Sequence, residues 1–168
     1  MIVKLKGKID NYSENFIDID VKDIVYRILM TNSNIEFFKE ITTEVEIFIY
    51  EIIKEDSRTF VGFKDFQERE VFSDLLTVQG VGSKMAINIM SSLECSEIIA
   101  SIKADEISRL TKISGVGQKL AKRILNELKE KLQKKFELSD FKISEKDQKT
   151  KNDLISCLVN LGYPTKIS

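Results

Sequence analysis

Hydrophobic and polar side chains alternate with a period of two through the first 63 residues of the chain. Val3, Leu5 and Ile9 lie on one side of an extended backbone, and the lysines between them lie on the other. The runs that read as strands lie at residues 3–9, 17–21, 23–30, 45–49 and 59–63. About five strands in so short a stretch predict a small barrel of the OB type over residues 1–63, although the strand count alone fits an SH3-like barrel equally well.

The spacing of the hydrophobic residues then becomes helical. From Phe66 onward they recur every three or four residues, as at Phe72, Leu75 and Leu76. We therefore expect an α+β multidomain protein in which an all-α region, residues 64–136, follows the barrel.

The last part of the chain is poor in hydrophobic side chains. Residues 137–150 hold too few apolar groups to offset the entropy of ordering them, which predicts a flexible linker. Residues 151–168 contain one short amphipathic run that Gly162 and Pro164 end. One such helix cannot form a domain by itself.

The helical region contains an internal repeat. Residues 75–90, LLTVQGVGSKMAINIM, return as LTKISGVGQKLAKRIL at residues 110–125, with a constant offset of 35 positions. Each copy reads as a short helix, a Gly-Val-Gly turn and a second helix that begins near Ser83 or Gln118. This is the pattern of a helix-hairpin-helix, and eight matched positions make chance a poor explanation.

The repeat points to phosphate binding. Paired glycines permit positive φ and let the backbone approach a ligand closely, while the free N–H groups at the start of the second helix attract an anion. Lys84 and Lys119 lie in the first turn of those helices, where a positive charge opposes the helix dipole unless an external anion is present. One Gly-Val-Gly could simply close a pair of helices, but two copies with the same lysine spacing favour a phosphate site. The candidate DNA-contacting residues are Gly80, Val81, Gly82, Ser83, Lys84, Gly115, Val116, Gly117, Gln118, Lys119, Lys122 and Arg123.

The net charge of −1 hides an uneven distribution of charge. Residues 80–136 hold 11 basic and 6 acidic side chains, a net +5, whereas residues 1–63 hold 8 basic and 12 acidic ones, a net −4. A basic helical region next to an acidic barrel is typical of a protein that steers nucleic acid to one part of its surface.

The composition excludes several classes of enzyme. The chain has no histidine, which removes the Ser-His-Asp triad, the Cys-His dyad, the histidine proton shuttle and the ordinary histidine-containing zinc site. Its two cysteines are far apart, its start lacks the apolar segment of a signal peptide, and no run approaches the ~20 apolar residues that span a bilayer. We expect a cytoplasmic protein that has no membrane span and none of these histidine-dependent sites.

Together these features resemble the RuvA family, which binds Holliday junctions in bacteria. The resemblance rests on the start MIVKLKGKI, on VGF at residues 61–63, on QERE at 67–70 and on the hairpins with Lys84 and Lys119. It implies an OB-type domain that builds a homotetramer. Either one tetramer or two, which together form an octamer, hold the DNA. It also implies that the tandem hairpins grip the minor-groove side of each junction arm.

The resemblance further implies an acidic pin, a barrel turn that repels phosphates at the centre of the tetramer and helps to separate strands. The matching turn in this chain is KEDSR, with Glu55 and Asp56 at its tip. The residues by themselves suit an ordinary polar hairpin turn.

The implied function is to bind Holliday junction DNA by shape and to position a RuvB-type motor ATPase for branch migration in recombination, DNA repair and the SOS response. A RuvC-type resolvase is a further implied partner, and the resemblance implies that the motor hydrolyses ATP. Because no P-loop motif occurs in this chain, we expect it to have no catalytic residues, no metal site and no cofactor. The chain departs from the family at Lys22 and Asp23, where members usually carry glycines. Residues 151–168 match only the first helix of the family's three-helix motor-binding domain.

Two other functions fit parts of the sequence. Tandem hairpins also suit a non-catalytic module of an excision nuclease, which would bind forks or bubbles without a four-fold assembly. A helix-hairpin-helix DNA glycosylase or lyase would need a lysine nucleophile and a downstream aspartate, for which Lys119 and Asp140 are the candidates.

Overall fold

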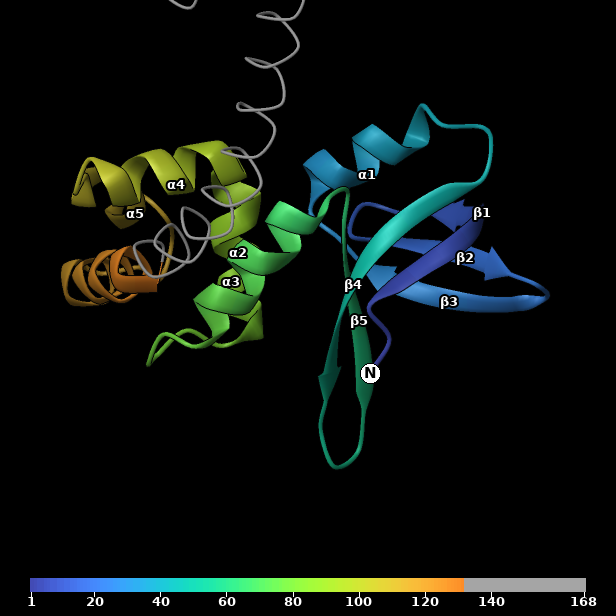
Figure 1. Cartoon of the computed structure of the whole chain (residues 1–168), viewed down its shortest axis with the longest axis horizontal. Coiled ribbons are helices and arrows are strands. Elements are labelled where there is room, and N and C mark those ends of the chain that lie inside the picture. Colours follow the sequence, from blue (N-terminus) through green and yellow to red (C-terminus); the bar gives the residue numbers. More distant parts are fainter. Residues whose placement is uncertain (132–168) are drawn as a thin grey trace, which may run out of the picture. The chain divides into compact units, whose positions relative to one another are not determined.

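A closed β-barrel opens the computed structural model, which describes residues 1–131 (Figure 1). Its strands are β1 (Lys4–Tyr12), β2 (Phe16–Val21), β3 (Ile24–Leu29), β4 (Val45–Ile53) and β5 (Arg58–Phe63). They are paired in the order β1-β2-β3-β5-β4, and β4 pairs with β1 to close the barrel. β3 and β5 run parallel, while the other neighbours are antiparallel. This order confirms the predicted OB-type barrel, which the strand count alone does not distinguish.

The alternation of the sequence accounts for the barrel core. Ile17, Ile28 and Ile47 come from the apolar sides of three strands and have no exposed surface, and burial of each such side chain contributes about 1.5–3 kcal/mol. The polar side of β1 faces outward, where Lys4 Nζ lies 2.9 Å from a carboxylate oxygen of Glu46 on β4. One period of two therefore sets both the packed interior and the charged exterior.

The turn between β2 and β3 keeps a tight geometry without glycine. Lys22 and Asp23 have positive φ values of 53° and 69°, as both central residues do in a two-residue type I′ hairpin turn. The Asp23 N–H donates a hydrogen bond to Asp20 Oδ1 at 2.8 Å. Because left-handed backbone costs a residue with a Cβ atom about 1–2 kcal/mol, this departure from glycine lowers stability but leaves the register of the strands intact.

One element inside the barrel region is not predicted by the alternation. Helix α1 (Asn32–Lys39) lies between β3 and β4, in a stretch where a period of two predicts no helix. Thr31 caps it, its hydroxyl accepting a hydrogen bond from the Asn34 N–H at 3.4 Å, and the helix buries Ile35 and Phe38 against the barrel core. The signal is present in the sequence, since a threonine cap is followed by apolar residues three positions apart.

Helices follow the barrel, as predicted. They are α2 (Phe66–Leu76), α3 (Ser83–Ser92), α4 (Cys95–Lys103), α5 (Ile107–Thr111) and a last helix whose described residues are 118–131. α2 attaches this region to the barrel, because the ring of Phe72 lies 5.3 Å from that of Tyr50 and 5.1 Å from that of Phe63. The predicted linker 137–150 and helix 151–168 lie outside the described residues.

Within residues 1–131 no single helix is both long and apolar enough to cross a membrane. α3 and α4 taken together meet that criterion by length and composition alone, although they are bent by 93° relative to each other.

Candidate nucleic-acid interface

The two copies of the repeat fold in the same way. In the first, the Val81 N–H donates to the Val78 carbonyl at 3.0 Å, and in the second, the Val116 N–H donates to the Ile113 carbonyl at 3.0 Å. Both central valines are buried, with 5% and 3% of their surface exposed. The helix-hairpin-helix pattern is therefore present twice. The N–H groups of Val81 and Val116 are used within their own hairpins and their side chains are buried, so neither of these two predicted DNA-contacting residues offers a phosphate a free donor.

The two glycines of each turn have different roles. Gly80 and Gly115 have φ values of 95° and 84°, which a residue with a Cβ atom rarely adopts. Gly82 has a φ of −91° and is the N-cap of α3, and Gly117 is not among the described residues with positive φ. The first glycine of each pair therefore uses the positive φ that glycine permits, whereas the second does not.

The second glycines leave room for an external group. A Cβ atom built on Gly82 or on Gly117 would meet no atom within 4 Å, so internal packing does not demand glycine there. A glycine cap offers no side-chain oxygen to the first helix amides, and α3 has no acidic residue in its first turn. α1 and α2, by contrast, are capped by Thr31 and Asp65. The start of α3 therefore presents amides and positive dipole to whatever approaches the loop.

A lysine follows each loop, in the first turn of the next helix. Lys84 and Lys119 lie in the first turn of their helices as predicted, and both are exposed, as is Lys122 one turn further on. Ser83 is half-buried, and Gln118 is exposed. Two copies of an amide-rich loop with an adjacent cation can hold two phosphate groups.

Arg123 makes a contact that its sequence position does not reveal. Its Nη1 donates a hydrogen bond to the Gln79 carbonyl at 2.9 Å, in the loop of the other hairpin. Asn88, which no sequence motif singles out, donates from Nδ2 to the Ser114 carbonyl at 2.9 Å. These two bonds join the hairpins to each other.

The predicted acidic turn lies at the end of a two-stranded ribbon. β4 pairs with β1 only from Val45 to Phe48, and its outer part pairs with β5, so the ribbon projects beyond the barrel (Figure 1). The turn is closed by a hydrogen bond from the Lys54 N–H to the Ser57 carbonyl at 2.8 Å. Glu55 and Asp56 are exposed at its tip.

A buried carboxylate holds the base of this ribbon. The side chain of Glu51 has no exposed surface, yet one oxygen accepts the Ile2 N–H at 2.9 Å and the other lies 3.0 Å from Arg58 Nη2. The sequence contains the signal for this group, because Glu51 continues the inward-facing series of β4 at a position where an apolar residue is expected.

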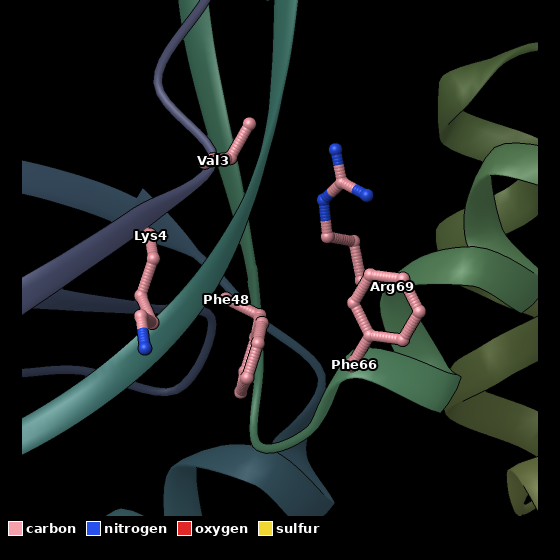
Figure 2. Close-up of a pocket in the computed structure, with 5 residues that line it drawn as sticks. All are labelled: Val3, Lys4, Phe48, Phe66 and Arg69. Carbon is pink, nitrogen blue, oxygen red and sulfur yellow. The ribbon is translucent and has the colours of Figure 1, made fainter.

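A shallow pocket of about 320 Å³ lies between the barrel and α2 (Figure 2). Its lining residues are Val3, Lys4, Phe48, Phe66 and Arg69. The rings of Phe48 and Phe66 meet edge to face at 6.2 Å, and Arg69 Nε is hydrogen-bonded to the Ile49 carbonyl at 2.8 Å. This lining brings no carboxylate or thiol into the pocket, and its one amine, Lys4 Nζ, is paired with Glu46 at 2.9 Å.

Cys95, the first residue of α4, carries a partly buried thiol. Burial raises the pKa of the Cys95 thiol to about 11, which keeps it protonated and unreactive near neutral pH. Within residues 1–131, no three metal-ligating side chains are grouped so that they could hold an ion. Asp140, which would complete a lyase with Lys119, lies outside the described residues.

Comparisons with known proteins agree with both parts of the fold. Residues 1–62 match the model of the RuvA N terminal domain, and residues 72–130 match that of the SAM-like helix-hairpin-helix tandem. Similar curated proteins include those of Geobacter sulfurreducens, 36% identical over 97% of this chain and 83% of the relative, and Citrifermentans bemidjiense, 37% identical over the same shares. That of Syntrophus aciditrophicus is 31% identical over 99% of this chain and 84% of the relative. Each is described as a Holliday junction branch migration complex subunit RuvA.

Proposed function

The chain belongs to the RuvA family, and on that premise we propose that it binds Holliday junction DNA as a non-catalytic subunit of a branch migration complex. One observation carries the proposal. In each hairpin loop a glycine, which has no side-chain oxygen for the helix amides, directly precedes the second helix, next to an exposed lysine and with open space at that glycine. Two such loops suit two phosphates of a DNA backbone.

Recognition then follows the shape of the DNA. Contacts from backbone amides and from Lys84, Lys119 and Lys122 to phosphates carry no information about base sequence. They make binding strongly dependent on salt, since each neutralised phosphate adds about −0.9 to the slope of log K against log salt concentration. Preference for a junction over a duplex must therefore come from the arrangement of several hairpin pairs.

A four-fold assembly supplies that arrangement. In a homotetramer, alone or doubled into an octamer, hairpin pairs from several subunits engage the junction arms at once and gain avidity. The projecting ribbon carries Glu55 and Asp56 away from the barrel, as an acidic pin requires. At the centre of the assembly these carboxylates repel phosphates and favour an open crossover.

Partner proteins supply the ATP hydrolysis and the DNA cleavage. A RuvB-type motor hydrolyses ATP and drives branch migration in recombination and repair, and a RuvC-type resolvase acts on the same junction in the cytoplasm. The RuvA N terminal domain match before the hairpins favours this role over that of an excision-nuclease module. The predicted motor-binding residues 151–168 lie outside the described residues.

The test combines selectivity with stoichiometry. The full chain is titrated onto a four-way junction, onto a second junction with a permuted base sequence and onto a duplex of one arm's sequence, and the mass of each complex is measured. We expect both junctions to bind equally and more tightly than the duplex, with a tetramer or octamer on each junction. A monomer on the junction, or equal affinity for duplex, contradicts the proposal.

A further inference from the structure

The two hairpins contact each other through residues that the repeat makes equivalent. Under the offset of 35, Asn88 corresponds to Arg123 and Gln79 corresponds to Ser114. Asn88 Nδ2 donates to the Ser114 carbonyl at 2.9 Å, and Arg123 Nη1 donates to the Gln79 carbonyl at 2.9 Å. The second helix of each hairpin therefore holds the loop of the other, in a reciprocal arrangement like that of a two-fold axis.

A second pair of contacts repeats the same exchange. The position of a Cβ atom on Gly80 lies 3.5 Å from Leu120 Cδ1, and that on Gly115 lies 2.9 Å from Met85 Cε. Met85 and Leu120 are themselves equivalent under the offset. Each left-handed glycine thus packs beneath a side chain of the opposite hairpin, and the two loops cannot shift independently without breaking these contacts.

The hydrogen bonds also orient the amides that follow them. Gln79 and Gly80 share one peptide plane, in which the C=O and N–H groups point in opposite directions because the bond is trans. A donor that holds the carbonyl from one side aims the Gly80 N–H toward the other, and the same holds for Ser114 and Gly115. Among the described residues no hydrogen bond uses the N–H of Gly80 or Gly115, so both amides remain able to donate to a ligand.

We propose that Asn88 and Arg123 are positioning residues of the DNA-binding site, each of which aligns the phosphate-binding loop of the opposite hairpin and so fixes the spacing between the two loops. This inference rests on the proposed function. It assigns Arg123 a role through Gln79 in place of a direct phosphate contact, and it brings Asn88, an uncharged residue, into the site. The paired loops then bind two phosphates as one preorganised unit.

The crossed geometry gives a distinctive test by double-mutant cycles. Asn88 lies on the helix of the first hairpin but acts on the loop of the second. Asn88→Ala should therefore be non-additive with Gly117→Ser, which disables the second loop, and additive with Gly82→Ser, which disables the first. Arg123→Gln should show the reverse pattern. Junction affinities of the full chain, measured by titration of labelled DNA, provide all the terms.

The expected size of the effects separates positioning from contact. Asn88→Ala and Arg123→Gln should each weaken junction binding about five-fold, the loss of one hydrogen bond, with the salt dependence unchanged. Ser92→Ala, which removes a hydroxyl one turn after Asn88 on α3, serves as the control and should leave affinity unchanged. If the slope of log K against log salt became shallower by ~0.9 in Arg123→Gln, Arg123 would instead contact a phosphate directly.

A measurement without DNA tests the alignment directly. In the free protein, Asn88→Ala should shift the amide resonance of Gly115, and Arg123→Gln should shift that of Gly80. Unmoved resonances, or effects additive with both loop variants, would overturn the positioning role while leaving the proposed function standing. Unchanged affinity in both Gly82→Ser and Gly117→Ser would overturn the proposed function, and the role of the cross-hairpin bonds with it.

Discussion

Replacement of the second glycine in each hairpin by serine should strengthen the fold and weaken DNA binding. Gly82 has a φ of −91° and a ψ of 175°, which serine adopts without strain, and its Cβ position is empty to 4 Å, as is that of Gly117. Serine is a good N-cap whose hydroxyl accepts an amide of the first helical turn, so we expect a gain of a few tenths of a kcal/mol in unfolding free energy per site.

The same hydroxyl competes with a phosphate. It takes an amide that would otherwise donate to the anion, and the added atoms occupy the space through which the DNA backbone approaches. A hydrogen bond to a charged group contributes about 1.5–3 kcal/mol, so each substitution should lower junction affinity at least about ten-fold. The junction affinity of the double variant Gly82→Ser, Gly117→Ser should fall by the product of the two single-variant factors.

The assay pairs a urea denaturation series with junction titrations at one salt concentration. Gly82→Ala is the companion variant, because it adds a Cβ atom without the competing oxygen and isolates the effect of close approach. A serine variant that is as stable as the parent, or more so, and binds the junction with unchanged affinity would refute the argument that these glycines make room for phosphate.

Three further predictions concern the barrel. Asp23→Gly should raise the unfolding free energy by about 1 kcal/mol, because it removes the strain of a φ of 69° and keeps the backbone N–H that bonds Asp20; no gain in urea denaturation would contradict this. The hydrogen bonds from Arg27 to Asp18, at 2.9 Å each, lower the pKa of that carboxyl. The resulting stability is present above the ordinary pKa of an aspartate and is lost as pH falls through the lowered pKa. Asp18→Asn should therefore reduce the loss of unfolding free energy measured from about pH 5 to about pH 2. An unchanged loss over that pH range would count against the pairing. Glu55→Gln with Asp56→Asn should keep or raise junction affinity and reduce the preference for junction over duplex, and an unchanged preference in competition titrations would exclude the acidic pin.

The fold is largely predictable because its signals are local. A period of two identifies the five strands, and the offset of 35 identifies the two hairpins. α1 escapes this reasoning because an eight-residue helix between two strands offers little periodicity, and its evidence lies in the Thr31 cap and the spacing of Ile35 and Phe38. The type I′ turn at Lys22 and Asp23 lacks the glycine that such turns favour, and the register of β2 and β3 fixes it as a two-residue connection.

The candidate site is predictable residue by residue but not in its connections. The glycines and lysines of the loops stand out because both copies repeat them. The bonds of Asn88 and Arg123 depend on how one hairpin packs against the other, which no spacing within a hairpin reveals. The role of Glu51 is hidden for the related reason that its partners, Ile2 and Arg58, come from other parts of the barrel.

The most direct test of phosphate binding by the two hairpins is the salt dependence of junction affinity in Lys84→Ala and Lys119→Ala. Lys103→Ala removes the same charge from the last turn of α4 and serves as the control. We expect each hairpin variant to fold normally and to bind the junction more weakly. The slope of log K against log salt, which is negative, should become shallower by ~0.9 per lost phosphate contact, whereas the control keeps the parent slope. Parent affinity and parent slope in both hairpin variants would contradict the account.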